Sequence, residues 1–74
     1  MKVKEIMTKD VKTVKPSDTV SQAASIMEQL NVGSVPVVDN DKVVGIVTDR
    51  DIVIRNVARG QKPDQKISDV MTSN

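Results

Sequence analysis

The chain contains no cysteine and no histidine among its 74 residues. Without cysteine it can form neither disulfides nor thiolate metal sites. Without histidine it lacks the most common general base and zinc ligand of proteins. No clustered pair of carboxylates offers a substitute, so the composition argues against an enzyme and against a metal site.

Phenylalanine, tryptophan and tyrosine are also absent, so the core must be built from Val, Ile, Leu, Met and Ala. No aromatic ring can stack on bases, and a net charge of +1 is no footprint for a nucleic acid polymer. No apolar run reaches membrane-spanning length and no signal peptide opens the sequence. We therefore expect no nucleic acid polymer and no membrane as partner, and a cytoplasmic location.

The length sets a further limit. A chain of 74 residues makes one small domain at most, and such a domain buries only about 60% of its unfolded surface. With disulfides and metals excluded, oligomerisation is the remaining common route to stability.

The first part of the chain reads as a strand followed by a helix. Val11–Val14 alternates as a short strand. An amphipathic stripe then predicts a helix over about residues 20–30, with Ser17 or Asp18 as its N-cap and Asn31 at its end.

A β-hairpin and a second helix follow. Val35–Thr48 predicts two strands joined at the turn pair Asn40-Asp41, and residues 49–59 predict a helix closed by Gly60. The strand-helix-strand part implies a parallel crossover, and the hairpin adds antiparallel pairing. The predicted fold is therefore α+β, in the order β-α-β-β-α, with a small mixed three-stranded sheet and two helices.

The second helix is apolar on more than one side, through Ile52, Val53, Ile54 and Val57. A helix of this kind usually meets two neighbours. We expect one of them to be another copy of the chain or a tandem repeat.

The sequence Gly45-Ile46-Val47-Thr48-Asp49-Arg50-Asp51 joins the last strand to this helix. Thr48-x-x-Asp51 is close to a capping box, which needs no ligand. A carboxylate with a hydroxyl beside it also suits a sugar cis-diol, and Gly45 is typical of close backbone approach. Both interpretations stay open at this stage.

The two ends of the chain resemble each other. Val3–Asp10 matches Ile67–Asn74 at an offset of 64, with two identical positions. We therefore expect one repeat at 1–60, a linker at 61–66, and the opening of a second repeat at 67–74.

Five motifs together resemble the CBS (cystathionine-β-synthase) domain over nearly the whole chain. They are Ile6-Met7-Thr8, Val11-x-Thr13-Val14-x-Pro16, Ala23-Ala24-x-x-Met27, Val32-Gly33-Ser34-Val35-Pro36-Val37-Val38-Asp39 and the Gly45–Asp51 sequence. The resemblance implies a β-α-β-β-α fold, usually found as tandem repeats packed into a Bateman module. It also implies a regulatory sensor that binds AMP, ATP or S-adenosylmethionine between repeats, with no required cofactor.

The family's ribose motif falls on Thr48 and Asp51, with Gly45 allowing close approach. Negative charge from Asp49 and Asp51 opposes a phosphate at this helix start. A phosphate would need Arg50, or a basic residue from a partner chain.

The resemblance places the adenine base and the cleft around it beside residues of all three predicted strands. With no aromatic in the chain, the base would lie between aliphatic side chains and be read by backbone groups. Ile46 is the candidate beside the base, and Thr13 and Val14 are candidates for the base edge. The residues that line the cleft would be Ser34, Val35, Pro36 and Val37.

Two functions therefore compete. One is a homodimer, paired through its helices, that binds an adenosyl small molecule. The alternative is a purely structural dimerisation domain with an empty cleft.

Overall fold

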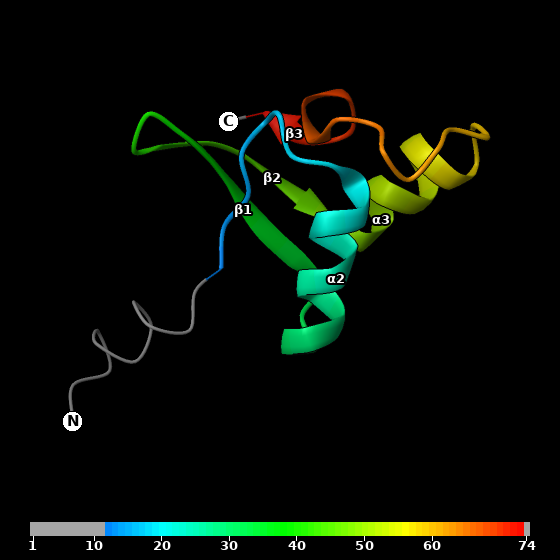
Figure 1. The fold of residues 1–74 in the computed structure, drawn as a ribbon, viewed down its shortest axis with the longest axis horizontal. Coiled ribbons are helices and arrows are strands. Elements are labelled where there is room, and N and C mark those ends of the chain that lie inside the picture. The colour runs from blue at the N-terminus through cyan, green and yellow to red at the C-terminus, as the bar shows by residue number, and fades with distance from the viewer. Residues whose placement is uncertain (1–11, 74) are drawn as a thin grey trace.

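The computed structural model describes residues 12–73, and Figure 1 shows their arrangement. Two α-helices and a three-stranded sheet confirm the α+β class. In chain order the elements are α2 (Val20–Leu30), β1 (Ser34–Asp39), β2 (Lys42–Thr48), α3 (Asp49–Ile52), the π-helical turn η1 (Val53–Val57), the 3-10 turn η2 (Ile67–Asp69) and β3 (Thr72–Ser73).

Strands β1 and β2 form the predicted hairpin, and Ser34 pairs with Thr48 at its open end. The turn residues Asn40 and Asp41 have φ of 50° and 64°, in the left-handed region. Two such residues in a row give the turn whose twist matches a β-hairpin, which is why an Asn-Asp pair lies there.

The third strand differs from the predicted one. The sheet order is β1-β2-β3 and both pairings are antiparallel, so the sheet is not mixed. Of the predicted strand Val11–Val14, Val11 lies outside the described residues and Val14 makes one parallel bridge to Val37. The pairing stops there because the chain turns at once: the Lys15 amide donates to the Asp18 carboxylate at 2.8 Å.

Helix α2 covers the predicted residues, but its N-cap is Thr19 and not the predicted Ser17 or Asp18. The Thr19 hydroxyl accepts from the Gln22 amide at 3.2 Å, and the Gln22 side chain accepts from the Thr19 amide at 2.8 Å. The predicted cap Asp18 is instead engaged in the preceding turn with Lys15. The predicted C-cap Asn31 is confirmed, with φ of 54°.

The second helix is shorter as an α-helix than predicted. After α3 the backbone continues as the π-helical turn η1, and the positive φ of 67° at Gly60 ends it. No helix among residues 12–73 has the length and apolar character needed to cross a bilayer. The cytoplasmic location stays a prediction.

Among residues 12–73, nine apolar side chains form the buried core. They come from the segment before α2, from α2, from both hairpin strands and from the C-terminal segment, and they are Val14, Val20, Ala23, Met27, Val35, Val37, Val47, Ile67 and Val70. Ile67 and Val70 are fully buried. The segment after α2 and the hairpin therefore completes the core of the unit.

The connection 61–66 lies against α2. The Gln65 and Pro63 carbonyls accept from the first two amides of that helix, at 2.9 and 3.0 Å. The buried Asn56 side chain donates to the Lys62 carbonyl at 2.9 Å and to Gln65 at 2.8 Å. The division into 1–60, 61–66 and 67–74 stays a prediction, and the Val3–Asp10 half of the repeat lies outside the described residues.

Candidate functional site

The face of the hairpin turned away from the core carries four of the predicted site residues. Along β1 and β2 the buried residues alternate with Ser34, Pro36, Ile46 and Thr48, which are exposed or half-buried. They form two cross-strand pairs, Ser34 with Thr48 and Pro36 with Ile46. Because directly paired residues share one side of a sheet, the four side chains form one surface, here called the outer face.

Thr72 extends the outer face onto the third strand. It pairs with Ile46, so Pro36, Ile46 and Thr72 form a row across β1, β2 and β3. Strand-to-strand spacing of about 4.8 Å makes the row compact.

Thr48 and Asp51 form a capping box at the start of α3. The Thr48 hydroxyl accepts from the Asp51 amide at 3.0 Å, and the Asp51 carboxylate accepts from the Thr48 amide at 3.0 Å. The interpretation of Thr48 and Asp51 as a capping box is therefore confirmed. The box leaves the Thr48 hydroxyl proton and part of the carboxylate's acceptor capacity for other partners.

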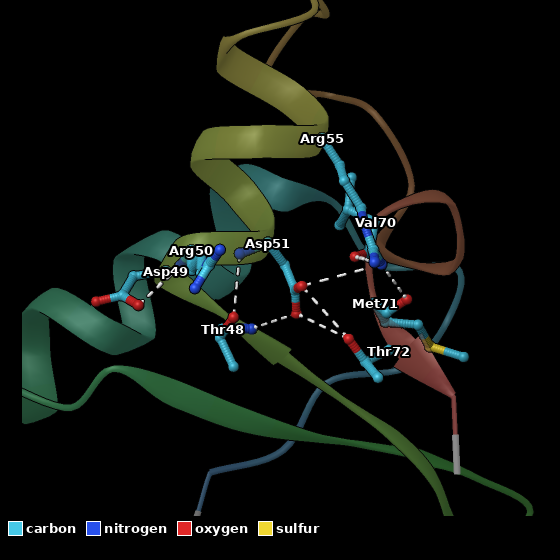
Figure 2. A network of polar contacts seen from close by, with 8 residues as sticks. All are labelled: Thr48, Asp49, Arg50, Asp51, Arg55, Val70, Met71 and Thr72. Carbon is cyan, nitrogen blue, oxygen red and sulfur yellow. Dashed lines mark hydrogen bonds and ion pairs between the residues drawn. The ribbon is translucent and has the colours of Figure 1, made fainter.

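The Asp51 carboxylate has further neighbours, shown in Figure 2. The Thr72 hydroxyl lies 3.4 and 3.5 Å from its two oxygens, and the Arg55 guanidinium lies 3.9 Å from one of them. Arg55 also donates to the carbonyls of Val70 and Met71, at 3.0 and 3.1 Å. Asp51 and Arg55 thus hold the C-terminal segment beside the candidate ribose site.

Sequence reasoning missed Thr72 and Arg55. The spacing of Asp51 and Arg55, four residues apart, is the signal for an ion pair on one helix face. Thr72 is one of the two identical positions in the repeat, matching Thr8, and that identity pointed to a role.

The close packing of the third strand explains why residue 45 is a glycine. A Cβ at this position would lie 2.5 Å from the Thr72 carbonyl oxygen and 3.3 Å from the Ser73 Cα. No side chain fits there while β3 is paired. The close approach inferred from the sequence exists, and its partner in this structure is backbone.

Three predicted residues belong to the core. Val14, Val35 and Val37 are buried, so their side chains serve packing. Val35 also borders a pocket. Its neighbours on either side, Ser34 and Pro36, face outward.

That pocket lies between the end of α2 and β1 and has a volume of about 190 Å³. Its lining is mostly aliphatic, and the residues are Lys12, Ile26, Leu30, Val32, Ser34, Val35 and Pro36. We call it the β1 pocket. Sequence reasoning predicted the lining residues that lie on β1. It missed Ile26 and Leu30, because their helical spacing is typical of a core face.

Thr13 and Arg50 lie apart from the β1 pocket. Thr13 borders a hollow of about 410 Å³ beside the hairpin turn, with Asp39 and Asp41 among its lining. This hollow is larger, but its lining is polar, and its two carboxylates outnumber its one cation, Lys15, so its net charge disfavours a phosphate. Arg50 is exposed, and its side chain makes no hydrogen bond or ion pair with residues 12–73.

Comparison with known proteins places these features in a family. The CBS domain model matches residues 3–56. The CBS domain-containing protein YhcV of Bacillus subtilis (strain 168) is 45% identical over 71 residues, which cover 96% of this chain and 51% of that protein. This chain spans about half the length of the first curated relatives that it matches, 51% and 49%.

Solved structures agree. A cystathionine beta-synthase domain protein fused to a Zn-ribbon-like domain has a TM-score of 0.81 at 38% identity, covering 86% of this chain and 93% of that one. CBSX2 in complex with AMP has a TM-score of 0.72 at 25% identity, covering 89% of this chain and 53% of that one.

Proposed function

This chain belongs to the CBS domain family, and we propose that it is a regulatory module that binds an adenosine-containing ligand between the β1 pocket and the adjoining outer face of the hairpin. CBS domains generally act as regulatory rather than catalytic modules, and one structural neighbour is a complex with AMP. The observation that carries the proposal is the β1 pocket, which opens beside Ser34, the cross-strand partner of Thr48.

The β1 pocket suits the base. Its aliphatic side chains offer an apolar slot for a planar ring, and a few polar groups at its rim fix orientation. In a chain without aromatic residues, Ile26, Leu30 and Pro36 supply the surfaces on which adenine lies. Lys12 at the rim would face the phosphate or the base edge.

Thr48 and Asp51 suit the ribose. Thr48 lies beside the pocket, because it is paired with Ser34, and the capping box joins Asp51 to Thr48. A carboxylate accepts both hydroxyls of a cis-diol, and hydrogen bonds to a charged group are worth about 1.5–3 kcal/mol each. The exposed Arg50 is the nearest unengaged cation along the described chain for a phosphate.

A second unit completes the site in this proposal. Ligand pockets usually measure about 300–1,000 Å³, so the 190 Å³ of the β1 pocket suits a base and not a whole nucleotide. The apolar side chains of Val53, Ile54 and Val57 are exposed, as expected for a surface that pairs. A two-fold homodimer would bring two such surfaces together.

Isothermal titration with AMP, ATP and S-adenosylmethionine in turn tests the function. Far-UV circular dichroism first establishes that the protein is folded. We expect saturable binding of at least one compound, at one ligand per chain or per dimer. No heat with any of the three would contradict the proposal.

The alternative is a dimerisation domain in which Thr48 and Asp51 only cap α3. The complete capping box supports it, because this box needs no ligand. The double variant Thr48→Ala/Asp51→Ala separates the two functions. Unchanged affinity for the nucleotide with a loss of about 1 kcal/mol of stability would favour the alternative.

A further inference from the structure

The carboxylate assigned to the ribose is already occupied within the chain. Asp51 has only 12% of its side chain exposed, and both oxygens have a neighbour. One oxygen accepts from the Thr48 amide, while the Thr72 hydroxyl lies across the pair, as Figure 2 shows. A cis-diol needs two acceptor positions, and the Thr72 hydroxyl lies within 3.5 Å of both carboxylate oxygens, so the diol and Thr72 compete for the same two oxygens.

Thr72 is the partner most easily displaced. Its hydroxyl lies 3.4 and 3.5 Å from the two oxygens, whereas a well-formed O–H···O bond measures about 2.5–3.0 Å. The Thr48 amide lies at 3.0 Å and belongs to the cap, so losing it would also cost α3 its first turn.

The element that carries Thr72 is itself weakly held at this edge. Strand β3 has two residues and two paired positions, Gly45 with Ser73 and Ile46 with Thr72. The chain is held more firmly just before β3, where Arg55 donates to the Val70 and Met71 carbonyls. Thr72 and Ser73 can therefore leave while the buried Val70 stays in place.

We propose that the Thr72 hydroxyl competes with the ligand's ribose for the Asp51 carboxylate, so that Thr72 sets the affinity of the site and reports its occupancy. This inference rests on the proposed function. Binding of a ribose at Asp51 frees Thr72 and loosens the β3 pairing at Gly45 and Ile46. Coupling between two contacts is reciprocal. The factor by which the ligand weakens the contact between Thr72 and Asp51 is therefore also the factor by which removing the Thr72 hydroxyl strengthens ligand binding.

The test is isothermal titration of AMP into the full chain and three variants. Thr72→Val removes the hydroxyl and nearly keeps the shape, while Thr72→Ser keeps a hydroxyl. Ser73→Ala is the matched control, since it removes a hydroxyl from the next residue of β3, which does not touch Asp51. We expect AMP to bind Thr72→Val about three- to tenfold more tightly than the unmodified chain, as for loss of one competing hydrogen bond.

Thr72→Ser and Ser73→Ala should bind AMP as the unmodified chain does. Amide hydrogen exchange at Thr72 and Ser73 should accelerate when AMP is added, while exchange at Val70 stays slow. Equal or weaker binding by Thr72→Val, with AMP still bound by the unmodified chain, would overturn this inference alone. If none of the four proteins binds AMP, the same titrations are made with ATP and S-adenosylmethionine, and no binding of any of the three would overturn the proposed function together with this inference.

Discussion

Asp51 serves several partners through one carboxylate. It caps α3 through the Thr48 amide, faces the Arg55 guanidinium and receives the Thr72 hydroxyl. The first role is structural and is fixed by local sequence. The other two join the helix start to a segment about twenty residues away, so the residue that we propose reads the ribose also holds the third strand.

Gly45 gives the most direct residue-scale prediction. In Gly45→Ala the new Cβ would clash with the Thr72 carbonyl, because 2.5 Å is far inside contact distance, so β3 must shift or detach from β2. We expect the free energy of unfolding to fall by about 1–3 kcal/mol, as for other overpacked sites. Urea denaturation followed by far-UV circular dichroism measures it.

Gly33→Ala is the control for that variant. Its Cβ would meet only the Asp49 side chain, at 3.3 Å from a carboxylate oxygen that can move. If Gly45→Ala were as stable as Gly33→Ala, the third strand would not be packed against β2 as described.

At the scale of elements, α2 shows how a helix start is chosen among neighbours. Ser17, Asp18 and Thr19 are all capable caps. Asp18 turns back to the Lys15 amide, and its own carbonyl accepts from the Ile67 amide at 2.8 Å. These contacts leave Thr19 as the residue whose hydroxyl faces the helix.

Replacing Thr19 therefore has a predictable cost. We expect Thr19→Ala to lower the free energy of unfolding by about 1 kcal/mol, because the Gln22 backbone amide loses the Thr19 hydroxyl as its acceptor and the capping box is broken. Thermal and urea unfolding measure this loss. Ser17→Ala, at the residue that the sequence also suggested as a cap, should be neutral, and equal losses in both variants would contradict the assignment.

The hairpin and the third strand show which elements could be predicted from the sequence and which could not. The Asn40-Asp41 turn and the Thr48–Asp51 spacing are local signals, so the hairpin and the capping box were predictable. Strand β3 has two residues, too few to show a period of two. The strand side of the β1 pocket was predictable, because Ser34 and Pro36 belong to a recognisable strand. Its helix side was not, because Leu30 follows the spacing of a core helix.

At the scale of the molecule, the exposed apolar turn η1 predicts self-association. Val53 and Val57 are 56% and 64% exposed, on the surface that no described element covers. We expect the double variant Val53→Glu/Val57→Glu to be monomeric at concentrations where the unmodified chain is a dimer. Sedimentation velocity distinguishes the two states.

Val43→Glu is the matched control for the interface. Val43 is 55% exposed, as much as Val53, but lies on the hairpin strand. If it disrupted association equally, or if the unmodified chain were monomeric, pairing through η1 would be ruled out.

The most direct test of the ligand site is titration of AMP and 2′-deoxy-AMP into the unmodified chain and into Asp51→Asn. The asparagine carbonyl still accepts from the Thr48 amide, so the cap is kept while the charge that holds the diol is lost. We expect the unmodified chain to prefer AMP by about tenfold or more, and Asp51→Asn to bind both weakly and without preference. Equal affinity of the unmodified chain for the two nucleotides would show that Asp51 does not read the ribose.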